Sequence, residues 1–154
     1  MVVQRACPCP EAPDDDRIAS WAEAAFQAGG PPGRGDPALT IRVVDEDEAA
    51  ALNHTYRGRD YAPNVLSFPM NTGESFDTGL LGDVVICAAV LEREAAEQGK
   101  IPEAHWAHLV IHGVLHCCGF EHDSTAGARR MESLEKRILA DFGFPDPYTL
   151  HNER

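Results

Sequence analysis

The sequence predicts an α+β fold in which about five helices pack against one small mixed sheet. The chain has 154 residues, a length that suits a single domain with a proper core, and we expect this domain to span residues 1–154. Apolar residues recur at helical spacing in five segments and form short strand-like runs in three others. The order of these segments suggests an α+β domain, in which a small sheet has helices against it.

The first half of the chain predicts two helices and two strands. Residues 14–28 begin with acidic residues and carry apolar residues at helical spacing, and the Gly- and Pro-rich stretch that follows predicts a loop. We expect a strand at 39–44, a second helix after Asp45, and a short strand at 65–68 that a proline closes. The polar residues 71–79 predict a hairpin tip or a mobile turn.

The second half predicts one strand and three helices. Residues 80–87 form a mostly apolar run typical of a well-buried strand, in which Asp83 needs a partner. The helix after this strand should end at Gly99, and the next should run from Pro102 to Cys118 with an apolar face toward the core. A last helix is expected at 125–142, so three helices gather around a histidine-rich segment.

Composition narrows the function classes. The 25 acidic and 13 basic residues give a net charge of -12, which repels a polyanion at long range, so any nucleic-acid binding must come from a local basic patch or a partner. No apolar run approaches the roughly 20 residues that span a bilayer, and the first residues do not look like a signal peptide, so we expect a cytoplasmic protein. The closely spaced Cys7, Cys9, Cys117 and Cys118 predict reduced thiols.

Three histidines near a glycine predict a metal site. His112 and His116 are four residues apart, so their rings lie on one helix face and can converge on one ion. Gly119 should end the helix and turn the chain so that His122 approaches the same point. Three neutral nitrogens leave a fourth tetrahedral position open, as in a catalytic zinc site. We therefore expect one Zn²⁺ per chain, held by a zincin-like metal helix.

The histidines of this segment allow other interpretations. His108, His112 and His116 cannot share one ion because eight residues span about 12 Å of helix, whereas zinc lies about 2.1 Å from each nitrogen. His105 and His108 are expected to line a cleft or to satisfy buried partners. The metzincin signature has the same histidine spacing, but Gly113 stands where its general base Glu would be, which disfavours a peptidase. A metal-dependent hydrolase of peptides or small esters stays open as an alternative.

Four segments together resemble one known family. They are HGVLHCCGFEH, LNHTYRGRDYAPNVLSFP, LLGDVVICAAVLEREAAEQGK and EAHWAHLVIHG. In these motifs the chain resembles the YbeY family of bacterial endoribonucleases and rRNA maturation factors. Two departures are visible: Phe120 and Glu121 replace Tyr-Asp before the last histidine, and Pro63 replaces a threonine. Glu121 keeps the charge, so metal binding is expected to survive, whereas Pro63 should stiffen its loop.

The resemblance implies a single-stranded RNA substrate, the rRNA precursor, and a role in 16S rRNA 3'-end maturation and ribosome quality control. It also implies that His112, His116 and His122 bind zinc and that Arg57, in the Tyr-Arg-Gly motif, is needed for activity. A guanidinium can hold phosphate oxygens through two parallel hydrogen bonds. The simpler alternative is that Arg57 is a solvent-exposed loop arginine. Arg59 is a weaker candidate for substrate binding.

Two questions stay open at this point. The proton acceptor could be His108, or the ribose 2'-OH could act as an internal nucleophile, and a 2',3'-cyclic phosphate product would identify the latter. Asp123 could support a ligand histidine or cap the next helix.

The main rival function is a non-nucleolytic ribosome-assembly factor with a structural zinc, which would bind small-subunit ribosomal proteins or an assembly GTPase. The acidic charge suits such protein partners.

Overall fold

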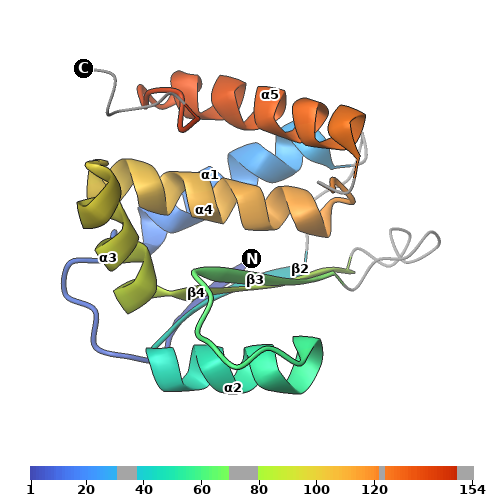
Figure 1. The fold of residues 1–154 in the computed structure, drawn as a ribbon. Coiled ribbons are helices and arrows are strands. Elements are labelled where there is room, and N and C mark those ends of the chain that lie inside the picture. The colour runs from blue at the N-terminus through green and yellow to red at the C-terminus, as the bar shows by residue number, and fades with distance from the viewer. Residues whose placement is uncertain (31–37, 70–79, 122–123, 149–154) are drawn as a thin grey trace.

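A computed structural model describes residues 1–30, 38–69, 80–121 and 124–148, the side chains of residues 80 and 81 excepted (Figure 1). The described chain contains nine elements in the order β1, α1, β2, α2, β3, β4, α3, α4, α5. The strands are β1 (Val2–Arg5), β2 (Ala38–Val44), β3 (Val65–Pro69) and β4 (Leu80–Cys87). The helices are α1 (Asp15–Gly29), α2 (Glu46–Arg57), α3 (Ala88–Gln98), α4 (Pro102–Cys117) and α5 (Thr125–Asp141).

The four strands form one mixed sheet in the order β1-β2-β4-β3. The strands β1, β2 and β4 run parallel, and β3 pairs with β4 in the antiparallel direction. Figure 1 shows α2 against one face of the sheet, with α1, α4 and α5 stacked on the other. The helix α4 lies between the sheet and α5, and it also contacts α1. The predicted α+β class, with a small mixed sheet and five helices, is therefore confirmed for the described residues.

The alternation of side chains along the central strands separates two apolar clusters. Ile41 and Val84 point into the larger cluster, which α1, α4 and α5 complete. Val44 and Val85 point to the opposite face and pack in a smaller cluster beneath α2. Asp83 shares a face with Val85 and is exposed, so the expectation that it is buried in the strand and needs a partner is wrong.

The sequence predicted every element of the described chain except β1, and most bounds agree within two residues. Strand β1 has only four residues, most of them exposed, so it shows neither an apolar run nor clear alternation. It is held by backbone pairing, with Val3 opposite Ile41. Residues 71–79, expected as a turn, lie outside the described residues. None of the described helices is long and apolar enough to cross a membrane.

The helix α4 lies directly on the sheet because it carries a glycine at the crossing point. A methyl group at Gly113 would lie 2.5 Å from Cγ1 of Val84, so a larger residue would push the helix away. The hydroxyl of Ser67 donates a hydrogen bond to the carbonyl of Gly113 at 3.0 Å. The helix ends as expected: Gly119 has φ of 104°, a value that favours glycine, and the chain turns away there.

Candidate functional site

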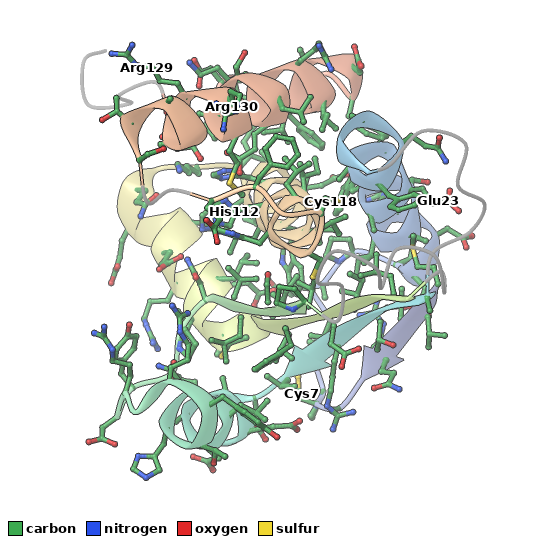
Figure 2. The ribbon with its side chains drawn as sticks, turned by 90° about the vertical axis from the view of Figure 1, so that its right-hand side faces the viewer. Cys7, Glu23, His112, Cys118, Arg129 and Arg130 are labelled. Atoms are coloured by element: carbon green, nitrogen blue, oxygen red, sulfur yellow. The ribbon has the colours of Figure 1, made fainter. Side chains whose placement is uncertain are left out.

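Four histidines lie along one face of α4, and two of them face each other. The ring Nε2 atoms of His112 and His116 are 3.1 Å apart. Two nitrogen ligands of one tetrahedral zinc ion would lie about 3.4 Å apart, given zinc–nitrogen distances of about 2.1 Å. The observed separation therefore suits either two ligands of one ion or a hydrogen bond between the rings. Figure 2 looks nearly along α4 and shows His112 on the side of the helix away from α1.

A buried carboxylate from α5 supports this histidine face. Glu135 is fully buried, and its Oε2 accepts a hydrogen bond from Nδ1 of His112 at 2.6 Å. Its Oε1 accepts hydrogen bonds from the hydroxyl of Tyr148 and from Nε2 of His108, the latter at 3.3 Å. Burial by itself would raise the pKa of Glu135, but the hydrogen bonds and charges of His108 and His112 lower it to about 2. Glu135 is therefore ionised at neutral pH and acts as an acceptor.

His108, His112 and Glu135 form a group that could hold a metal ion. Each offers one ligand atom, and these atoms lie within 4.8 Å of one another. His122, which the sequence predicts as a zinc ligand, lies outside the described residues. His112 and His116 lie together as expected, whereas Glu135 was not predicted from the sequence.

A signal for Glu135 was present in the sequence. The apolar residues of α5 include Met131 and Ile138, and Glu135 stands between them on the same stripe. A carboxylate on an apolar stripe is costly to bury without partners, so it indicates a buried polar cluster. Tyr148 follows α5 in an irregular segment, and no periodicity marks it. Its pKa is raised by burial and by the hydrogen bond to Glu135, so it remains a donor.

The two facing histidines open onto a cleft of about 720 Å³. The side chains of Tyr56 and Arg57, at the end of α2, line this cleft together with His112 and His116. Such a volume falls in the range of about 300–1,000 Å³ that is common for ligand sites. The structure thus places Arg57 and two of the predicted zinc ligands in one cleft. Glu121 also lines it.

Other residues singled out by the sequence lie elsewhere. Arg59 does not line this cleft, and its backbone N–H donates to the carbonyl of Asn53 in the turn after α2. His108 is buried and does not line the cleft, since its Nε2 faces Glu135 and Tyr148.

His105 is also buried and bonds Glu94 of α3 through Nε2 at 3.1 Å. His108 therefore bonds a buried partner, which is one of the two uses expected for it, whereas Glu94, the partner of His105, is only partly buried.

The cysteines serve packing rather than metal binding in the described chain. All five are free. Burial raises the pKa of Cys117 and of Cys118 to about 12, so both thiols are protonated at neutral pH. A thiol must lose its proton to become a good metal ligand, so these side chains are poor candidates for the metal site.

Comparison with known proteins gives consistent matches. The family model described as Endoribonuclease YbeY matches residues 11–143. A Pseudomonas putida protein named Endoribonuclease YbeY is 56% identical over 137 residues, which cover 88% of this chain and 85% of that protein. Proteins of the same name are 54% identical in Pseudomonas fluorescens, over 95% of this chain and 93% of the relative, and 51% identical in Halorhodospira halophila, over 89% and 88%.

A solved structure supports the fold. The solution structure of a Thermotoga maritima protein aligns with 96% of this chain and 97% of its own, with a TM-score of 0.59. The two sequences are 21% identical, so this likeness concerns the fold alone.

Proposed function

Because the chain belongs to the YbeY endoribonuclease family, we propose that it is a zinc-dependent endoribonuclease specific for single strands. Its substrate is the precursor of 16S rRNA, and its task is 3'-end maturation and ribosome quality control in the cytoplasm. The observation that carries the proposal is the shared cleft of about 720 Å³, in which Arg57 and the facing rings of His112 and His116 all take part.

The metal site proposed here uses His112, His116 and His122 as ligands, with one Zn²⁺ per chain. The described residues fit such an ion because Nδ1 of His112 donates to Glu135, which leaves the lone pair of Nε2 facing His116. A zinc ion bound there supplies Lewis acidity, which acidifies water and polarises a phosphoryl oxygen. The coordination of a third nitrogen, from His122, is part of the proposal.

Arg57 is the residue that binds the scissile phosphate. It stands at the last position of α2, so its side chain reaches the cleft from the side opposite α4. A guanidinium holds two phosphate oxygens at once and stabilises the negative charge that grows on them in the transition state. The net charge of -12 provides no long-range attraction for RNA, so this local cation is essential to binding.

Tyr56 gives the cleft its preference for single strands. The residue is 66% exposed, and its ring packs edge-on against Phe68 of β3, with 5.2 Å between ring centroids. Both residues line the cleft beside Arg57. An exposed aromatic ring stacks on an unpaired base, whereas the bases of a duplex are already stacked on one another. The geometry therefore favours RNA in which the bases near the cleaved bond are unpaired.

Glu121 is the proton acceptor in this proposal. It is the one carboxylate among the cleft-lining residues in the described part of the chain. Its carboxylate takes the proton from the water that attacks the phosphorus atom, the P–O bond to the leaving ribose oxygen breaks, that oxygen takes a proton from solvent, and a linear phosphate end results. If the ribose 2'-OH is the nucleophile instead, the first product carries a 2',3'-cyclic phosphate.

A comparison of three samples tests the function: native protein, chelator-treated protein and the Arg57→Ala variant, each incubated with single-stranded rRNA. Cleavage by the native protein, but by neither the chelator-treated protein nor the Arg57→Ala variant, supports the proposal. Cleavage that survives both treatments indicates a contaminating nuclease and contradicts it.

The charge of -12 also favours protein partners, namely small-subunit ribosomal proteins or an assembly GTPase. A protein that binds such partners but never cleaves RNA would be an assembly factor with a structural zinc.

A further inference from the structure

Glu135 uses both of its oxygens within a cluster that three separate segments build. The carboxylate comes from α5, His108 and His112 come from α4, and Tyr148 comes from the segment after α5. Gly143, with φ of 85°, lies at the bend that returns this segment toward α4. The cluster is thus held by tertiary packing, and Glu135 is fully buried within it.

The distances decide between two uses of this carboxylate. If Glu135 and His112 were ligands of one ion, their ligand atoms would lie about 3.4 Å apart, given metal–ligand distances of about 2.1 Å and a tetrahedral angle. Oε2 of Glu135 and Nδ1 of His112 are 2.6 Å apart, which is a short, charge-assisted hydrogen bond. The other oxygen, Oε1, is occupied by Tyr148 and His108. Glu135 therefore hydrogen-bonds Nδ1 of His112, and the ion would be bound by Nε2 on the far side of the same ring.

We propose that Glu135 is a positioning residue, which fixes His112 with its proton on Nδ1 and its Nε2 directed at the metal, and that Tyr148 holds Glu135 in place. The inference rests on the proposed function, because the metal is the one proposed there. A carboxylate behind a ligand histidine orients the ring and makes it a stronger ligand, and its loss commonly costs about 10–100-fold in metal affinity.

Tyr148 ties the segment after α5 to the metal centre. Its hydroxyl bonds Oε1 of Glu135 and lies 3.2 Å from Nε2 of His108. Its backbone N–H donates to Oδ1 of Asp146 at 2.8 Å, and Asp146 lies 3.7 Å from the ammonium of Lys136 on α5. These contacts fix the hydroxyl over the carboxylate. Removing it should loosen Glu135 and weaken metal binding, although Tyr148 has no contact with the ion.

The first experiment reads the tautomer of His112 directly. Long-range ¹H–¹⁵N NMR spectra of the zinc-loaded protein, with His112 assigned by substitution, distinguish a ring that binds metal through Nε2 from one that binds through Nδ1. We expect the proton on Nδ1 and the metal on Nε2. A ring that binds metal through Nδ1 would overturn the proposal, since Glu135 could not then accept that proton.

The second experiment measures zinc affinity by competition with a chromogenic chelator. Glu135→Gln should bind zinc about 10–100-fold more weakly, as for other residues behind a ligand histidine, and Tyr148→Phe should show a smaller loss of several-fold. Asp141→Asn is the matched control, because it makes the same change of charge at an exposed position of α5 and should keep the native affinity. Native affinity in Glu135→Gln contradicts the positioning role of Glu135, and native affinity in Tyr148→Phe contradicts the supporting role of Tyr148.

The cobalt-substituted protein separates positioning from coordination. If Glu135 only positions His112, Co²⁺ in Glu135→Gln keeps the band positions and intensity of the wild type once the site is saturated. A changed coordination spectrum would show that Glu135 is itself a ligand. Circular dichroism of each variant establishes that the fold is intact, and Tyr148→Phe, a change at a partly exposed side chain, keeps the test available if Glu135→Gln does not fold.

Metal content distinguishes failure of this inference from failure of the proposed function. If the wild type binds no stoichiometric metal, or His116→Ala binds as much as the wild type, the proposed metal site itself fails. If the wild type binds one ion, His116→Ala loses it, and Glu135→Gln keeps native affinity, only the positioning role of Glu135 is wrong.

Discussion

Ser67 of β3 donates a hydrogen bond from its hydroxyl to the carbonyl of Gly113 on α4, with 3.0 Å between the oxygens. This bond joins the strand that lines the cleft to the helix that carries the histidines. The same glycine lets the helix approach Val84 of β4 so closely that no side chain fits between them. The spacing between the histidines and the cleft wall therefore depends on one small residue in the middle of α4.

Gly113→Ala should destabilise the protein. The added methyl group would lie 2.5 Å from Cγ1 of Val84, a buried branched side chain that cannot swing aside. Overpacking of this kind costs about 1–3 kcal/mol of unfolding free energy, which urea unfolding measures. Ser67→Ala, which removes only the hydrogen bond, should cost about 1 kcal/mol. A Gly113→Ala protein as stable as the wild type would show that the helix shifts freely over the sheet.

Arg57→Ala should lower kcat/KM for RNA cleavage by about 100-fold or more, because a donor aimed at transition-state charge is worth that much. Zinc content should stay at the wild-type level, since the role proposed for Arg57 is to bind phosphate and not the ion. The kcat/KM of Arg57→Lys should lie between that of the wild type and that of Arg57→Ala, because an ammonium keeps the charge but loses the bidentate geometry.

Arg59→Ala provides the matched control. Arg59 is two residues away, outside the residues that line the cleft, so its loss should change the rate by a few-fold at most. An equal loss in both variants would show that general positive charge, rather than the position of Arg57, supports activity.

The sequence predicted the helices well because each carries its own local signals. For α5, Ser124 accepts a hydrogen bond from Gly127 as an N-cap, and apolar residues recur along one face. Short β1 carries no such signal, because its four residues are defined by their pairing with β2. Whether a strand forms at the edge of a sheet depends on tertiary contacts, so the local periodicity of the sequence cannot predict it.

The candidate site was predictable to the extent that its residues are close in sequence. His112 and His116 share a helix face, so their spacing alone brings them together. Arg57 was predicted from the resemblance to a family. The cleft that joins it to these histidines forms only when β3 and α4 pack on β4. Glu135 bonds His108 and His112, and Tyr148 bonds His108 and Glu135, from the far end of the chain, and no spacing rule places them there.

Tyr56→Ala should raise KM for single-stranded RNA and leave kcat nearly unchanged. Stacking of a base on an aromatic side chain contributes about 1–3 kcal/mol, and this contact is made equally in the ground state and the transition state. Tyr56→Phe should keep the native KM. Tyr61→Ala is the control, since Tyr61 is also exposed but does not line the cleft. A lower kcat with unchanged KM in Tyr56→Ala would exclude the stacking role.

The stability of the metal-free protein should fall as the pH is lowered below about 6.5. Burial lowers the pKa of His105 from its ordinary value of 6.5, although the hydrogen bond that its ring donates to Glu94 acts in the opposite direction. Because the folded pKa lies below the unfolded one, the unfolded chain binds more protons in this window. The contribution of His105 is therefore complete above pH 6.5 and is lost as the pH falls through the folded pKa.

Urea unfolding at a series of pH values measures this effect. His105→Gln removes the titrating ring, so its free energy of unfolding should change less with pH between 6.5 and 5 than that of the wild type. Identical pH profiles for His105→Gln and the wild type would show that burial of His105 does not control acid stability.

Glu121→Gln should lower kcat by about 100-fold or more if its carboxylate takes the proton of the attacking water, which is the usual scale of general base catalysis. Zinc affinity should change little, because the amide keeps the size of the side chain at the cleft wall. The nature of the RNA end supplies the independent check: hydrolysis by water leaves a linear phosphate. A 2',3'-cyclic phosphate, formed as fast by Glu121→Gln as by the wild type, would assign the attack to the ribose 2'-OH and leave Glu121 without a role in proton transfer.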